Sequence, residues 1–273
     1  MLLQSLGIWG KIFMTRIKSV FSNGKAFIAF ITAGDPDLDT TKDLILNMSR
    51  FGVDLIEIGI PFSDPIAEGT TIQKADERSL SAGTTLDKIF EMVMNVRKET
   101  QIPLAFMTYM NPVFAYGTDK FIKKCNECSI DAIIIPDLPF EEKREVLKYC
   151  NNQDIDLISM IAPTSKERIK MIASEATGFL YCISSLGVTG VRHHITADIN
   201  AMVSSVREVS DIPCAVGFGI STPEQAKIIT KCSDGVIIGS AIVQIIEEYG
   251  KDCIKPVCDY IQKIKIAISE DIS

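Results

Sequence analysis

Eight apolar segments rich in β-branched residues recur along the chain, and a polar stretch with helical spacing follows each of them. The segments are 25–33, 53–60, 103–109, 131–136, 156–162, 178–184, 212–218 and 234–239. They are almost continuously apolar, as parallel strands covered on both faces must be. Eight strand–helix repeats in 273 residues predict an α/β fold that closes into a single (β/α)8 TIM barrel.

Helix-starting residues support this reading. Asp39-Thr40-Thr41 and Thr222-Pro223-Glu224 are each expected to begin a helix, and Asp119 and Ser165 are further expected N-caps. An open doubly wound sheet is the alternative fold. Such a sheet usually has fewer strands and a glycine-rich fingerprint after the first one, whereas AGDPDLDTT follows here.

The barrel is predicted to occupy residues 14–273, with extra helices at the connections after strands 2 and 8. A short amphipathic helix is expected from Met14 to about Asn23-Gly24, since glycine is a common helix stop. Residues 1–13 precede that helix and are interpreted as an N-terminal extension, either a disordered tail or the result of an incorrectly assigned start.

Charge and cysteine content narrow the function classes. The chain has 28 basic and 35 acidic residues, a net charge of −7, which disfavours binding to nucleic acid or to an anionic membrane. An anionic substrate would therefore need a local trap such as backbone N–H groups. Eight scattered cysteines fit a reducing cytoplasm, and the Cys125/Cys128 pair has no second pair with which to form a zinc site. We expect neither a metal nor a membrane span.

Two glutamates mark the end of the second apolar segment, in IEIGIPFSDPIAEGTTIQ. Glu57 lies inside the strand, where its carboxyl group faces either the barrel lumen or the helix layer, and both are dry. It should be protonated or functional, or else paired with a lysine or a backbone group. Glu68 lies in the following loop, where an acid is ordinarily solvated. Together, two carboxyl groups in unlike environments can divide acid and base roles.

Small-residue turns follow strands 7 and 8. They contain Gly219 in GFGIS and Gly239-Ser240 in GSA, and each is followed by a helix. Glycines let backbone N–H groups approach phosphate oxygens, and the helix dipole favours the anion. Tight turns without a ligand are the alternative interpretation.

The segment 184–200 after strand 6 is long and contains glycine, so it is interpreted as a mobile lid. Thr189 could hydrogen-bond a carboxylate when the lid closes. His193 and His194 are adjacent, which does not suit joint metal binding, and they are expected to face solvent.

The sequence resembles the tryptophan synthase alpha chain family over residues 14 to 250. The matching strings are AFIAFITAGDPDLDTT, DLIEIGIPFSDPIAEG, MTYMNPVFAYG, DAIIIPDLPFEE, FLYCISSLGVTG, AVGFGIST and GVIIGSAIV. The resemblance implies a lyase that cleaves indole-3-glycerol phosphate to indole and glyceraldehyde 3-phosphate by a retro-aldol reaction, without a cofactor. It also implies that the indole passes to a beta subunit within an alpha2-beta2 assembly.

The resemblance also assigns site residues. Glu57 matches the catalytic glutamate, and Glu68 stands where the family pattern has an aspartate in A-D-G-P, which reads Ala67-Glu68-Gly69-Thr70 here. The implied substrate-binding residues are Tyr181, Thr189, Gly190, Phe218, Gly219, Gly239 and Ser240. Pro61 and Asp64 are implied to face the beta subunit.

Two other functions fit the same barrel. One is a stand-alone lyase that releases indole, and the other is a weakly catalytic barrel that activates a beta partner. The substitution at Glu68 motivates the second, whereas Glu57 and the two phosphate turns argue against it.

Overall fold

The computed structural model describes residues 16–183, 192–217 and 219–269. The N-terminal extension 1–13 and the candidate site residues Thr189, Gly190 and Phe218 lie outside this part of the chain.

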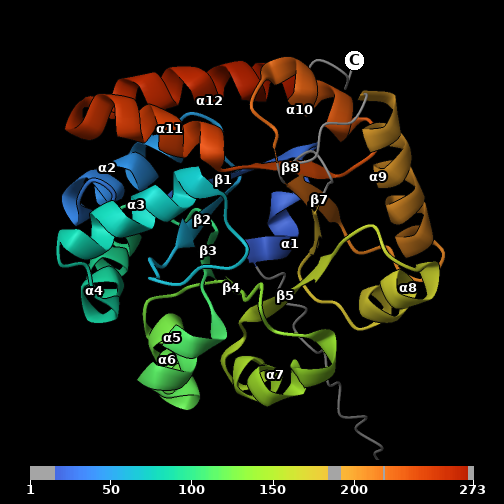
Figure 1. Cartoon of the computed structure of the whole chain (residues 1–273), viewed down its shortest axis with the longest axis horizontal. Coiled ribbons are helices and arrows are strands. Elements are labelled where there is room, and N and C mark those ends of the chain that lie inside the picture. Colours follow the sequence, from blue (N-terminus) through green and yellow to red (C-terminus); the bar gives the residue numbers. More distant parts are fainter. Residues whose placement is uncertain (1–15, 184–191, 218, 270–273) are drawn as a thin grey trace, which may run out of the picture.

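Eight parallel strands form a closed barrel in the order β1 to β8, which confirms the predicted TIM barrel and excludes the open sheet (Figure 1). The strands are β1 (Ala26–Thr32), β2 (Leu55–Gly59), β3 (Leu104–Met107), β4 (Ala132–Ile134), β5 (Asp156–Ile161), β6 (Leu180–Ile183), β7 (Cys214–Gly217) and β8 (Gly235–Ile238). Each lies inside one of the eight predicted segments. The first and last strands pair directly, with Ala26 opposite Gly235.

Helices surround the strands on the outside of the barrel, except for α1, which lies at the centre of the barrel in this view and packs against the lumen side chains (Figure 1). They are α1 (Arg16–Val20), α2 (Leu38–Met48), α3 (Thr70–Ser81), α4 (Leu86–Arg97), α5 (Met110–Tyr116), α6 (Thr118–Glu127), α7 (Arg144–Cys150), α8 (Lys166–Ser174), α9 (Arg192–Arg207), α10 (Pro223–Thr230), α11 (Ser240–Tyr249) and α12 (Ile254–Ser269). Three 3-10 turns join them, η1 (Phe140–Glu142), η2 (Asn151–Gln153) and η3 (Gly250–Asp252).

The extra helices expected after strands 2 and 8 are present as the pairs α3/α4 and α11/α12. A third pair, α5/α6, lies between β3 and β4 and was not expected. Gly117 separates its two helices with φ +91°, a backbone conformation that favours glycine. The N-terminal helix α1 ends at Val20, earlier than predicted, and its Ile17 is fully buried and belongs to the same apolar cluster as the barrel lumen.

Two of the four expected helix starts are confirmed. The Thr222 hydroxyl accepts a hydrogen bond from the Gln225 N–H in a complete capping box, and the Ser165 hydroxyl accepts one from the Arg168 N–H. Both residues have extended backbone, as an N-cap requires.

The other two helix starts were placed wrongly. The N-cap of α2 is Asp37, because its extended backbone lets its carboxylate accept from the Thr40 N–H at 2.7 Å. Asp39 lies in the first turn, where its negative charge interacts favourably with the positive end of the helix dipole. Asp119 likewise lies in the first turn of α6, which begins directly after Gly117.

Side chains on the strands alternate between two apolar clusters. Ile28 and Phe30 of β1 belong to the cluster in the lumen, whereas Phe27, Ala29 and Ile31 belong to the cluster between barrel and helices. Because the strand period is two, this alternation decides which side chains face the lumen.

A buried carboxylate ties the N-terminal end of the barrel together. Asp131 directly precedes β4 and accepts from Arg16 at 2.6 Å, from Arg97 at 2.9 Å and from the Leu104 N–H at 2.9 Å. It therefore links α1, α4 and β3 through a side chain that is only 7% exposed.

Candidate active site

Glu57 lies in the middle of β2 and faces the lumen. It pairs with Phe30 of β1 and Ala105 of β3, both of which belong to the lumen cluster. Its chain neighbours Ile56 and Ile58 belong to the outer cluster. The alternative in which this carboxyl group faces the helix layer is thereby excluded.

The Glu57 carboxyl group is wholly buried, and neither of its oxygens has a hydrogen-bond partner in the described part of the chain. The interpretation of Glu57 as a paired structural residue is therefore wrong for the described residues. Burial, with a smaller contribution from the nearby Glu68 charge, raises its pKa to about 8. At neutral pH Glu57 carries a proton in an apolar site, the state that a general acid requires.

Glu68 lies in the loop between β2 and α3, and its carboxylate is not solvated as that of an ordinary loop acid would be. It accepts a hydrogen bond from the Tyr109 hydroxyl, while its backbone carbonyl accepts one from the Gln73 side chain at 2.9 Å. Burial raises the pKa of Glu68, and the hydrogen bond from Tyr109 opposes that effect. The two glutamates therefore lie in different environments, as acid and base roles demand.

The two acids line one cavity of about 80 Å³ at the C-terminal mouth of the barrel. Its apolar walls are Phe30, Ile72, Met107, Tyr181, Ile220 and Ile237, and its remaining lining includes Gly219, Gly239 and Ser240. The structure thus brings together six of the nine residues predicted to be catalytic or to bind substrate. The other three, Thr189, Gly190 and Phe218, lie outside the described residues.

Tyr181 of β6 forms part of the wall because Gly217 of β7 leaves room for its ring. A Cβ atom at Gly217 would lie 2.7 Å from the Tyr181 hydroxyl oxygen, which is closer than real Cβ contacts allow. Burial raises the pKa of Tyr181 well above its ordinary value, and the charges of Glu57 and Glu68 add to the shift. The ring is therefore a neutral surface suited to a planar aromatic group.

The turns after β7 and β8 face the same cavity. Gly219 has φ +75°, a conformation that glycine adopts without strain. Ser240 is the first residue of α11, a helix of ten residues, and it lines the cavity together with Gly239, so the N-terminal end of this helix borders the cavity. No lysine or arginine lines the cavity among the described residues. An anion there would be held by backbone N–H groups and the helix dipole.

Pro61 and Asp64 belong to the loop that connects β2 to Glu68, and neither lines the cavity. Pro61 is buried, whereas Asp64 is exposed and accepts a hydrogen bond from the Ser63 hydroxyl at 2.5 Å. Asp64 is therefore the member of this pair that is open to a partner.

Sequence reasoning missed four residues of this site: Phe30, Met107, Tyr109 and Asp76. Tyr109 ends the third predicted strand segment, so its position at a strand end was the available signal. Asp76 on α3 is 5% exposed, and burial together with the Glu68 charge raises its pKa to about 8.

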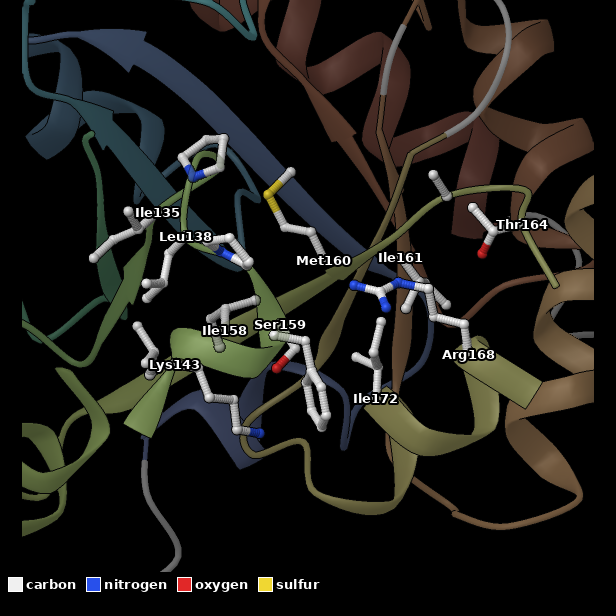
Figure 2. A pocket seen from close by; sticks show the side chains of 15 residues that line it. Ile135, Leu138, Lys143, Ile158, Ser159, Met160, Ile161, Thr164, Arg168 and Ile172 are labelled. Atoms are coloured by element: carbon white, nitrogen blue, oxygen red, sulfur yellow. The ribbon is translucent and has the colours of Figure 1, made fainter. Parts of the chain in front are cut away.

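A larger cavity of about 210 Å³ lies outside the barrel, over β5 and between the β4–α7 connection and α8 (Figure 2). Lys143 and Arg168 line it, and no carboxyl group does. Lys143 donates to the Glu175 carbonyl at 3.1 Å and Arg168 pairs with Glu141 at 2.7 Å, so both cations already have partners. Despite its size, this cavity lacks the paired acids of the lumen site.

The described residues provide neither a metal-binding cluster nor a membrane-spanning helix. No group of three or more His, Cys, Asp or Glu side chains there could hold a metal ion. Cys125 and Cys128 are buried free thiols at the end of α6. No helix in the described ranges is long and apolar enough to cross a bilayer.

A closed barrel with two unlike carboxyl groups at its C-terminal mouth defines a (β/α)8-barrel enzyme of acid–base chemistry. The family model described as "Tryptophan synthase alpha chain" matches residues 17–268. The chain belongs to the tryptophan synthase alpha chain family, whose members are lyases that cleave indole-3-glycerol phosphate.

Individual relatives in this family are similar to the chain over most of its length. The tryptophan synthase alpha chain of Alkaliphilus metalliredigens is 46% identical over 242 residues, which covers 88% of this chain and 91% of the relative. The crystal structure of tryptophan synthase subunit alpha from Legionella pneumophila superposes with a TM-score of 0.85 at 34% identity and covers 94% and 99% of the two chains. A chain from the tryptophan synthase a2b2 complex of Pyrococcus furiosus superposes with a TM-score of 0.81 at 33% identity, covering 88% and 98%.

Proposed function

We propose that this chain is a tryptophan synthase alpha subunit, which cleaves indole-3-glycerol phosphate to indole and glyceraldehyde 3-phosphate. The observation that carries the proposal is Glu57. Its carboxyl group is wholly buried, has no partner among the described residues, and shares one apolar cavity with Glu68. Family membership supports the choice of substrate.

The chemistry follows from the two environments. Glu57, protonated at neutral pH, donates its proton to C3 of the indole ring and makes the ring an electrophilic indoleninium cation. Glu68, whose charged form is favoured by the hydrogen bond from Tyr109, stabilises the cation near the ring N–H. The bond between C3 and the glycerol carbon then breaks, its electron pair restores the neutral indole, and the glycerol hydroxyl becomes the aldehyde.

The hydroxyl proton leaves to a carboxylate in the same step. Glu57, which has just given up its proton, and Glu68 are both present in the cavity and either can accept it. In both cases one proton enters the ring and one leaves the hydroxyl, so the enzyme needs neither a metal nor an organic cofactor for this reaction.

For the substrate phosphate, we assign the backbone N–H groups at Gly219 and Ser240, with Gly239 allowing close approach. Thr189, Gly190 and Phe218 complete the proposed substrate site on the strength of the family resemblance. Tyr181 is assigned to pack against the indole ring.

A beta subunit is the proposed partner, in an alpha2-beta2 assembly. Ile66 and Phe114 are 78% and 76% exposed, the largest values among the large apolar residues described as exposed. They lie in the connections after β2 and β3, at the rim where the site opens, together with exposed Asp64. We assign Asp64 a direct contact and the buried Pro61 a role in shaping the loop beneath it. The eight free thiols support a reducing, cytoplasmic location.

The test is a steady-state assay of the purified chain with indole-3-glycerol phosphate, with and without a beta subunit. A tryptophan synthase alpha subunit should cleave the substrate faster when the beta subunit is present, and Glu57→Gln should remove that activity in both conditions. Equal cleavage with and without the partner would identify a stand-alone lyase. Absence of cleavage, with activation of the beta reaction, would identify a weakly catalytic activator.

A further inference from the structure

A single hydroxyl group holds two neighbouring residues of the loop that carries Glu68. Tyr109 lies two residues after the end of β3, is 2% exposed, and its hydroxyl accepts a hydrogen bond from the Ala67 N–H at 2.9 Å. The same hydroxyl donates to the Glu68 carboxylate. Among the described side chains, Tyr109 is the one that hydrogen-bonds this carboxylate.

The direction of these bonds is fixed by proton count. The Tyr109 hydroxyl has one proton and accepts from Ala67, so its proton points to Glu68. A hydrogen bond donated to a carboxylate favours its charged form. Glu57 receives no such bond from the described residues. The hydroxyl therefore makes the two acids differ. It favours the charged form of Glu68, whereas Glu57 has no donor of this kind among the described residues and its burial favours the protonated form.

The tyrosine ring is itself fixed on two sides. Its centroid lies 5.4 Å from that of Phe62 in the same loop. The next residue along the chain, Met110, donates its N–H to Asp137 at 2.9 Å. Asp76 on α3 is buried, and its carboxyl group accepts a hydrogen bond from the Phe62 N–H of the same loop. The hydroxyl thus has little freedom to follow a carboxylate that moves.

We propose that Tyr109 is a positioning residue that determines where the Glu68 carboxylate lies and keeps it anionic, so that this chain can use glutamate at this position. The inference rests on the proposed function. A glutamate has one more rotatable bond than an aspartate, and holding it in one geometry costs more conformational entropy. A buried, rigid donor offsets that cost, since misplacement of a catalytic group by about 1 Å can cost about 100-fold in rate.

The test is Tyr109→Phe in the assembled complex with a beta subunit, followed by the pH dependence of kcat for indole-3-glycerol phosphate cleavage. We expect kcat to fall at least tenfold while KM changes less than about threefold. Loss of a hydrogen bond to a charged group should move the acid limb of the profile to higher pH by about 1 unit. The other titratable groups that interact electrostatically with Glu68 are Glu57, Asp76, Asp137 and Tyr181.

Two further variants separate positioning from packing. Tyr116→Phe is the matched control, because its hydroxyl donates to Asp87 at 2.6 Å near the surface, and it should leave kcat and the profile unchanged. In a Glu68→Gln background, Tyr109→Phe should cause no further loss, since Tyr109 acts through the charge of Glu68.

Several results would overturn the inference. They are an unshifted acid limb, a loss of kcat that adds fully to that of Glu68→Gln, or a parent-like kcat in Tyr109→Phe. Should Tyr109→Phe fail to fold, Glu68→Asp replaces it, because the shorter side chain draws the carboxylate away from the hydroxyl and should shift the same limb. If the parent chain itself does not cleave the substrate, the proposed function fails rather than the role of Tyr109.

Discussion

Replacement of Glu57 by glutamine should abolish cleavage and yet stabilise the folded chain at neutral and alkaline pH. The general acid contributes about 10²- to 10⁴-fold in such reactions, so kcat should fall at least that far. The gain in stability arises because the native state must keep this carboxyl group neutral in an apolar site, whereas the unfolded chain lets it ionise in water.

The sign and size of this stability change follow from the pKa of Glu57, which burial raises from 4.5 to about 8. Below pH 4.5 the group is protonated in both states, and its ionisation costs no stability. As the pH rises from 4.5 to about 8, the unfolded state ionises alone, and stability falls by about 1.4 kcal/mol per pH unit. At pH 7 the loss is about 3 kcal/mol, and it levels off at about 5 kcal/mol above pH 8.

Glutamine has the same shape and no ionisation, so it removes this loss. Its amide is as poor in partners as the protonated carboxyl group that it replaces, so the desolvation costs of the two side chains approximately cancel. The expected difference between variant and parent is under about 1 kcal/mol at pH 5, about 3 kcal/mol at pH 7 and about 5 kcal/mol at pH 8.5.

Urea unfolding of both chains at these three pH values, with kcat measured on the same samples, tests the reasoning. Glu77→Gln, an exposed position on α3, is the control and should change neither quantity. A stability difference that does not change with pH would show that Glu57 is not the buried neutral acid described above, and so would a variant less stable than the parent at pH 8.5.

Four further outcomes are expected. Glu68→Gln should lower kcat by about 10² or more, because the amide cannot stabilise the indoleninium cation, whereas Glu68→Asp should stay within about tenfold of the parent. Gly219→Val should raise KM for the substrate at least tenfold; Gly83→Ala, with a similar φ of +79° far from the cavity, controls for backbone strain. Ser159→Val, which fills part of the cavity over β5, should raise the free energy of unfolding by about 1 kcal/mol in urea titrations and leave kcat unchanged. Asp131→Ala should lower the free energy of unfolding by about 3–5 kcal/mol, since it leaves the buried Arg97 without its carboxylate partner and also removes the contact with the partly exposed Arg16.

Each of these has an outcome that would contradict it. Parent-like cleavage by Glu68→Ala in the presence of a beta subunit would show that Glu68 has no catalytic role. An unchanged KM in Gly219→Val would contradict the assignment of the substrate phosphate to the turn after β7. A destabilised Ser159→Val would mean that the cavity wall cannot accept a branched side chain. A loss below about 1 kcal/mol in Asp131→Ala would mean that the two arginines find other partners.

The barrel, and the rim at which the candidate site residues gather, could be predicted because both depend on coarse features of the sequence. Eight apolar runs specify eight strands, and parallel strands bring all their carboxyl ends to one rim. The orientation of Glu57 could not be predicted, because β2 is apolar on both faces and shows no alternation to read. Only the pairing of Glu57 with Phe30 and Ala105 assigns it to the lumen.

The contact between Tyr109 and Glu68 depends on the path of an irregular loop. Residues 61–69 contain two prolines and a glycine, and no periodicity describes such a backbone. The α5/α6 break and the cap of α2 were missed for a related reason, since one left-handed glycine or the choice between two nearby aspartates decides each of them. These are local choices that hydrophobic pattern does not resolve.

The pairing of β1 with β8 has a consequence for how the protein is made. The contact between Lys25 and the Ser233 carbonyl spans 208 residues, and that between Lys265 and Asp54 spans 211. During synthesis on the ribosome, β1 emerges first and has an unpaired edge until nearly the whole chain has been translated. A nascent chain that stalls before β8 would expose this edge together with the apolar lumen. The segment that begins with β8 therefore completes the strand pairing of all that precedes it, and truncation there should yield aggregates rather than a smaller enzyme.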